Sequence, residues 1–238
     1  MRNNIGLFFA KQTMLNPNRE AIVDVNAGKR YTYAEANLRM NRVASAARSA
    51  GVDKGDRVAT LLMNGHEFVE VFYGLAKIGA VTVALNWRLV ADELAFILGD
   101  SGAKTLIFDS AFTEVATELH RRGADATSVT AWVHVGDPGT RPEFAVGYED
   151  LLAAASDEEP VSDSADDDLL FIMYTSGTTG LPKGVMHSHS TTMWAIITGA
   201  ATAEMRKGDR YLICLPLFHV GATNPLFSTF YQGERLSS

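Results

Sequence analysis

Runs of apolar, β-branched residues alternate along this chain with segments whose apolar residues recur at helical spacing. This alternation is typical of a largely parallel sheet covered by helices, because a helix usually returns the chain from one parallel strand to the next. The sequence therefore predicts an α/β fold. The expected strands are residues 57–62, 81–85, 104–108, 129–133, 169–174 and 211–215.

Two helices have clear limits in the sequence. The first begins at Thr32, whose hydroxyl can cap backbone N–H groups while Glu35 reaches back in a capping box, and Gly51 ends it. The second closes near Gly79. Both apolar stripes are interpreted as core and not as a cofactor-binding face, because one-sided packing alone requires that spacing. The stripes are Ala36, Met40, Val43, Ala44 and Ala47 in the first helix, and Phe68, Val71, Phe72 and Leu75 in the second.

Acidic residues are concentrated in one part of the chain. Of the 28 Asp and Glu residues, ten fall within residues 142–182, a stretch without Lys or Arg, which leaves 18 acidic against 21 basic residues elsewhere. We expect residues 1–154 to form a first α/β lobe, 155–168 a solvated acidic linker, and 169–238 the start of a second lobe. A metal site in the linker is the alternative, but crowded carboxylates in a flexible run usually repel one another and stay in water.

Outside residues 142–182 the acidic and basic residues nearly balance. The chain therefore has no one-sided basic field, and no nucleic-acid partner is expected. The single cysteine, Cys214, excludes an internal disulfide and lies in an apolar run, which predicts an inert thiol in the core. The apolar stretch 5–10 is too short for the core of a secretory signal, and no apolar run approaches a membrane span. A cytoplasmic protein is predicted, with peripheral membrane contact left open.

The most specific motif is YTSGTTGLPKG, from Tyr174 to Gly184, which follows a predicted buried strand and precedes a helical segment at 190–201. Glycines let the backbone approach phosphate oxygens, hydroxyls donate to the same oxygens, and a lysine adds positive charge. The order differs from a Walker loop, because Gly184 follows the lysine in place of Ser or Thr. An exposed Ser/Thr/Gly turn is the alternative. The motif's glycines are Gly177, Gly180 and Gly184, its hydroxyl residues Thr175, Ser176, Thr178 and Thr179, and its lysine Lys183.

This motif resembles the signature of the adenylate-forming superfamily of acyl-CoA synthetases, luciferases and peptide-synthetase adenylation domains. Residues 31–108 and LPLFHVGA, at 215–222, resemble the N-terminal part of fatty acyl-CoA synthetases. The resemblance implies stacked sheets flanked by helices, in an incomplete N-terminal domain of an adenylate-forming enzyme. It also implies ATP, Mg²⁺ and coenzyme A, with a carboxylic acid, expected to be a fatty acid, as the group activated. An aryl-acid or carrier-loading enzyme, or a non-catalytic nucleotide-binding remnant, is the alternative.

Site residues follow from the same resemblance. The loop would wrap the β- and γ-phosphates of ATP through Thr175, Ser176, Gly177, Thr178, Thr179, Gly180 and Lys183. Thr175 would lie near the Mg²⁺, and His219 would border the acyl pocket. A metal site at His187 and His189 is an alternative to a structural role or a role in helix entry, but two ligands alone do not make a zinc site.

Later motifs of the family do not follow in this chain, including the Mg²⁺-sharing Glu and the catalytic Lys, so little or no ligase activity is expected from the chain alone. Glu234 and Arg235 do not suit a buried strand, which predicts a truncation, frameshift or artificial boundary near Ser238. Exposed apolar surface and association are also predicted. Oligomeric state and acyl chain length do not follow from the sequence.

Overall fold

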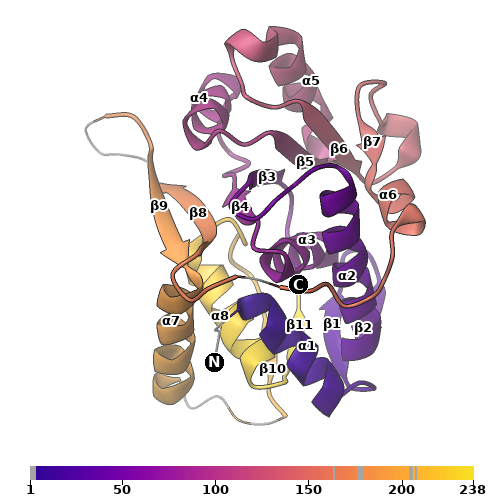
Figure 1. The fold of residues 1–238 in the computed structure, drawn as a ribbon, viewed down its shortest axis with the longest axis vertical. Coiled ribbons are helices and arrows are strands. Elements are labelled where there is room, and N and C mark those ends of the chain that lie inside the picture. Colours follow the sequence, from indigo (N-terminus) through magenta and orange to yellow (C-terminus); the bar gives the residue numbers. More distant parts are fainter. Residues whose placement is uncertain (1–3, 163, 176–179, 204–205, 207) are drawn as a thin grey trace.

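The computed structural model describes residues 4–162, 164–175, 180–203, 206 and 208–238, and it contains two sheets with helices on both faces of the larger one (Figure 1). The larger sheet has the strand order β7-β6-β5-β3-β4-β8-β9. Its strands are parallel except β9, which runs antiparallel to β8. They are β3 (Arg57–Leu61), β4 (Val81–Ala84), β5 (Thr105–Asp109), β6 (Ala131–Val135), β7 (Val146–Gly147), β8 (Leu169–Thr175) and β9 (Lys183–Ser188).

The smaller sheet has the order β10-β11-β1-β2 and brings the two ends of the described chain together. Its central strand β11 runs parallel to both neighbours, with Leu236 opposite Ile22 on one side and Tyr211 on the other. The strands are β1 (Glu20–Asp24), β2 (Lys29–Thr32), β10 (Arg210–Leu212) and β11 (Arg235–Ser237).

Helices cover both faces of the larger sheet. Helices α1, α2, α3 and α8 pack in one core with residues of both sheets, so they lie between the sheets, whereas α4 and α5 pack in a second core on the opposite face. The α-helices are α1 (Ile5–Leu15), α2 (Tyr33–Ser49), α3 (His66–Lys77), α4 (Ala91–Ser101), α5 (Thr113–Arg122), α6 (Tyr148–Ala154), α7 (His189–Thr202) and α8 (Val220–Tyr231), and the short 3₁₀ turns are η1 (Ser110–Phe112), η2 (Gly123–Asp125) and η3 (Pro138–Thr140).

The two predicted helices are confirmed. Thr32 caps α2, and Glu35 completes the capping box by accepting from the backbone N–H of Thr32 at 2.8 Å. Helix α3 ends at Lys77, and Gly79 follows with φ of +73°, a left-handed conformation that favours glycine. The stacked α/β architecture predicted for the chain is therefore present. Both sheets, however, contain strands from residues 1–154 and from residues 169–238.

The acidic segment after α6 is a solvated linker only in part. Asp157 pairs with Arg42 of α2 at 2.9 Å, and Glu159 pairs with Lys77 of α3 at 2.6 Å. Lys77 is fully buried and also donates to two asparagine side chains of α2. The segment is thus fastened across two helices because its carboxylates meet cations there.

Two predictions about the last third of the chain are wrong. The run 211–215 is not a buried strand: β10 ends at Leu212, and Cys214 is exposed because the chain leaves an edge strand there. Arg235 lies in β11, beside Glu234, and the fold accepts both because each has an opposite charge nearby. Glu234 is fully buried, and its Oε2 lies 2.6 Å from Arg19 Nη2. Arg235 forms an ion pair with Glu20.

Candidate functional site

The phosphate-loop motif forms the tip of a β-hairpin at the edge of the larger sheet (Figure 1). Thr175, the last residue of β8, lies opposite Lys183, the first residue of β9. Thr175, Gly180 and Lys183 are exposed. Ser176, Gly177, Thr178 and Thr179 lie outside the described residues.

The hairpin changes one part of the predicted setting. A strand, β9, stands between the loop and α7, so the order is strand, loop, strand, helix. Lys183 and Gly184 belong to that strand because they pair with Thr175 and Tyr174 across the hairpin.

Tyr174, next to the loop, fastens the hairpin to the rest of the fold. Its hydroxyl donates to Asp100 of α4 at 2.5 Å, and burial, followed by the Asp100 carboxylate, raises the pKa of Tyr174. Gly184 makes room for the ring, because a Cβ there would lie 3.0 Å from a ring carbon of Tyr174. The sequence offered no sign of the contact with Asp100, which joins residues 74 positions apart.

His219 is the N-cap of α8. Its Nδ1 accepts from the backbone N–H of Gly221 at 3.1 Å, and its side chain is exposed. Asn64, just after β3, holds the preceding segment: its side chain donates to the carbonyl of Leu215 and accepts from the N–H of Leu217, both at 2.9 Å. The sequence gives no sign of this role of Asn64, because only the fold brings residues 64 and 215–217 together.

Both predicted site segments lie at the carboxyl edge of the larger sheet. Strands β4 and β8 are parallel neighbours with Ala84 opposite Met173, so the residues that follow them emerge side by side. Trp87 follows β4, and its ring meets that of Phe218 edge to face, with 5.7 Å between centroids. Phe218 thus places the adjacent His219 at the edge from which the hairpin loop projects. Ligands of parallel sheets bind at this edge.

The two histidines after the loop have structural contacts. His189 is fully buried, its Nδ1 accepts from the N–H of Ile5 at 3.1 Å, and burial lowers its pKa to about 4. His187 stacks on Phe171 with 4.3 Å between centroids, and burial lowers its pKa as well. These contacts agree with the structural and helix-entry roles predicted for the pair.

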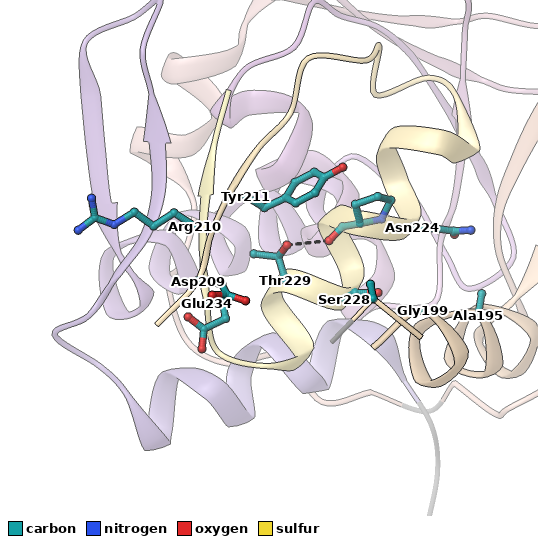
Figure 2. A pocket seen from close by; sticks show the side chains of 11 residues that line it. Ala195, Gly199, Asp209, Arg210, Tyr211, Asn224, Ser228, Thr229 and Glu234 are labelled. Carbon is teal, nitrogen blue, oxygen red and sulfur yellow. Dashed lines mark hydrogen bonds between the residues drawn. The ribbon is translucent and has the colours of Figure 1, made fainter. Parts of the chain in front are cut away.

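A cavity of about 480 Å³ lies beside α8, and His219 is not among the residues that line it (Figure 2). Small residues of α7 form one wall and β10 another, and the Thr229 hydroxyl donates to the carbonyl of Pro225 within its α8 wall at 2.7 Å. Its β10 end is polar because Asp209 and Glu234 lie there. The lining residues are Ala195, Gly199, Ala203, Asp209, Arg210, Tyr211, Asn224, Pro225, Ser228, Thr229 and Glu234.

A largely parallel sheet with helices on both faces defines the class of α/β proteins that bind ligands at the carboxyl edge of the sheet. Within this class the chain belongs to the AMP-binding enzyme family, whose model matches residues 9–237. The resemblance seen in the sequence is thereby confirmed.

Curated relatives are longer than this chain. The long-chain-fatty-acid–CoA ligase FadD13 of Mycobacterium tuberculosis is 39% identical over 235 residues, which cover 99% of this chain and 45% of that protein. A feruloyl-CoA synthase of an Amycolatopsis species is 34% identical, over 93% of this chain and 41% of that protein. The chain therefore spans somewhat less than half the length of these relatives.

A solved structure agrees with the fold over the full chain. The inhibitor-bound N-terminal domain of FACL13 from Mycobacterium tuberculosis superposes with a TM-score of 0.91 at 38% identity, over 100% of this chain and 57% of that one. The architecture described above is thus that of an N-terminal part of an AMP-forming acyl-CoA ligase.

Proposed function

We propose that the chain provides the phosphate-binding part of an AMP-forming acyl-CoA ligase, which activates a carboxylic acid with ATP and transfers it to coenzyme A. The observation that supports this most strongly is the hairpin from β8 to β9, whose Thr175 and Lys183 stand opposite each other at the open edge of the sheet. The likeness to FadD13 supports a fatty acid as the substrate.

Adenylation makes chemical sense because a carboxylate is a poor electrophile. In the proposed reaction a carboxylate oxygen bonds to the α-phosphorus of ATP and pyrophosphate leaves. The thiol of coenzyme A then attacks the acyl carbon and AMP leaves. The chain's contribution is to hold the departing phosphates, since positioning and charge stabilisation dominate such reactions.

The residues proposed to grip the β- and γ-phosphates are those of the hairpin. Lys183 supplies a positive charge at the start of β9, and the backbone and hydroxyl groups between it and Thr175 supply hydrogen-bond donors. The exposed Thr175 hydroxyl is an oxygen ligand of the kind that Mg²⁺ prefers, and bound Mg²⁺ would neutralise phosphate charge. The full set is Thr175, Ser176, Gly177, Thr178, Thr179, Gly180 and Lys183.

His219 is proposed to border the acyl pocket, since it stands exposed at the same carboxyl edge. The feruloyl-CoA synthase relative keeps an aryl acid as the second candidate for the substrate. The structure contains no helix able to cross a membrane within the residues that it describes. A cytoplasmic location stays a prediction.

Calorimetric titration of the purified chain with ATP and Mg²⁺ tests the phosphate site. Replacing Lys183 by Ala should weaken ATP binding roughly 10- to 100-fold, because a charge-assisted hydrogen bond contributes about 1.5–3 kcal/mol. Lys104→Ala, which removes an exposed lysine far from the loop in sequence, is the control. Equal affinity in all three proteins would contradict the assignment of the loop.

Pyrophosphate exchange by the full-length gene product, across a panel of fatty and aryl acids, tests the reaction. Exchange with fatty acids alone supports the main proposal, and exchange with aryl acids alone supports the second candidate. ATP binding without any exchange would favour a nucleotide-binding module over a ligase.

A further inference from the structure

The carboxyl edge of the larger sheet has a crevice between β3 and β5, away from the phosphate-loop hairpin. These two strands are parallel neighbours, yet α3, which follows β3, packs on one face of the sheet, and α5, which follows β5, packs on the other. Chain connections that diverge in this way leave a crevice beyond the strand ends, where α/β proteins commonly bind ligands. The phosphate-loop hairpin lies at a different strand, β8.

The structure has a cavity of about 320 Å³ at this point. The cavity is lined by residues that follow β3, by the ends of β5 and β6, and by the turn between β1 and β2. Three carboxylates line it, from Asp24, Glu67 and Asp109. The crevice therefore has a negative lining.

Two of these carboxylates converge on one imidazole nitrogen. His66 Nδ1 lies 2.8 Å from Asp24 Oδ2 and 3.1 Å from Glu67 Oε2. His66 is fully buried, and Asp24 is only 3% exposed. Asp24 also accepts from the backbone N–H groups of His66 and Ala27, at 3.1 and 2.9 Å, so the one ring N–H is the donor that the two carboxylates share.

Gly65 provides the space in which the two carboxylates meet. A Cβ at this position would lie 2.9 Å from Glu67 Oε2 and 3.4 Å from Asp24 Oδ2. The backbone of Gly65 is extended, with φ of −175°, so its conformation does not demand glycine. The missing side chain is explained by the space that the carboxylates occupy.

We propose that Asp24, His66 and Glu67 bind a divalent transition-metal ion, with zinc as the best-fitting member of the class. The three candidate ligand atoms all lie within 4.8 Å of one another. In a tetrahedral site with bonds of about 2.0–2.1 Å, ligand atoms stand about 3.3 Å apart, so small side-chain shifts suffice. Imidazole nitrogen and carboxylate oxygen both suit zinc, and Asp24 and Glu67 both line the crevice, from which water could supply a fourth ligand.

Metal binding requires His66 to change tautomer. Lys29 Nζ, a donor only, lies 3.4 Å from His66 Nε2, so without metal the ring proton belongs on Nδ1. With metal on Nδ1 the proton moves to Nε2, and the exposed Lys29 side chain turns into solvent. The ring stays neutral, and the metal replaces the proton between the imidazole and the carboxylates.

Calorimetric titration of the purified chain with ZnCl₂ tests the site, with Co²⁺ absorption as a report on ligand geometry. We expect saturable binding of one ion per chain. Glu67→Gln removes one ligand oxygen but leaves the hydrogen bond between His66 and Asp24, and it should weaken zinc binding at least about tenfold. Gly65→Ala should also weaken zinc binding, because the new methyl group displaces the Glu67 carboxylate.

The controls are Glu114→Gln and His120→Gln, which change an exposed carboxylate and an exposed imidazole of α5. Both should bind zinc as the original chain does. Absence of saturable binding would overturn the proposal, because the carboxylates would then share only the imidazole proton. Unchanged affinity in Glu67→Gln and Gly65→Ala, or a loss confined to His120→Gln, would overturn it too. If Glu67→Gln fails to fold, Gly65→Ala decides.

Discussion

The buried imidazole of His189 makes the stability of the fold depend on pH. Its ordinary pKa is 6.5, and burial lowers the pKa in the folded chain to about 4, despite the opposing effect of Asp168. Between these values the unfolded chain binds more protons, so the free energy of unfolding must fall as the pH falls. The full loss, reached below pH 4, is about 3 kcal/mol.

Urea denaturation at pH 7 and pH 5 measures this dependence. In His189→Gln, the amide oxygen can still accept from the N–H of Ile5 and nothing titrates, so the fall in stability between the two pH values should be smaller than in the original chain. An identical fall in both proteins would show that other groups cause it.

A second prediction concerns the contact between Tyr174, next to the loop of the hairpin, and Asp100 of α4. Tyr174→Phe removes the hydroxyl that donates to Asp100. Because Asp100 is exposed, we expect a loss of only about 1 kcal/mol in the free energy of unfolding. A double-mutant cycle with Asp100→Asn isolates the pair, and strictly additive losses would contradict the contact.

Single residues were predictable where the cause lay within a few positions. The capping box of Thr32 and Glu35 needs only the spacing of three residues. The buried Glu234 was not predictable, because its partner Arg19 lies 215 positions away and only the folded sheet joins them. The position of Lys183 opposite Thr175 is likewise set by the pairing of β9 with β8.

At the scale of the elements, β11 is the strand on which the smaller sheet depends. It lies between β10 and β1, and Leu236 at its centre is fully buried. Leu236→Ala should therefore lower the free energy of unfolding by about 2–5 kcal/mol. Leu15→Ala, at a site 70% exposed, should change it by less than about 0.5 kcal/mol. Thermal and urea denaturation compare the two, and similar losses would contradict a central position for β11.

The fastening of the acidic segment onto the helices leads to another prediction. Lys77→Met keeps the length of the side chain but leaves Glu159 and two asparagine side chains of α2 without their donor. Because Glu159 is 40% exposed, water can replace part of the interaction, and we expect a loss of about 2 kcal/mol. Proteolysis should also cut within 155–162 faster in the variant. An unchanged cleavage rate would contradict the fastening.

Most strands of the larger sheet that are buried on both faces could be predicted from the sequence, whereas the interior strand β1 of the smaller sheet was missed and the edge strand β10 was placed only in part. The apolar runs in the sequence predicted the bounds of β3, β4, β5 and β8 to within about two residues. Burial on two faces demands such a continuous apolar sequence. The edge strands β2 and β9 contain charged or exposed residues and gave no such pattern. β11 was missed for another reason: its flanking charges are neutralised by distant partners.

For the whole molecule, the sequence predicted the stacked α/β architecture but not how the chain distributes itself between the sheets. A strand's neighbours in a sheet are fixed by long-range pairing, which local periodicity does not encode. The pairing of β11 with β1, and of β8 with β4, makes residues 169–238 part of both sheets. The candidate zinc site likewise forms only when β1 approaches the start of α3.

The exposed apolar surface of β9 and α7 leads to a prediction about association. Met186 on the edge strand β9 and Trp194 on the adjoining α7 are 66% and 67% exposed, and Val185 and Ile197 beside them are 43% and 40% exposed. An unpaired edge strand with apolar side chains invites pairing with a second chain. The weight-average mass in sedimentation equilibrium should therefore rise with concentration.

Charged side chains on this surface should oppose the association. Met186→Lys combined with Trp194→Lys places two positive charges where two chains would meet, so the variant should keep the monomer mass at concentrations at which the original chain associates. Met14→Lys changes an even more exposed methionine, 84% exposed on α1, and should associate as the original chain does. If the original chain remains monomeric throughout, or if Met14→Lys alone abolishes association, then β9 and α7 are not the surface through which the chain associates.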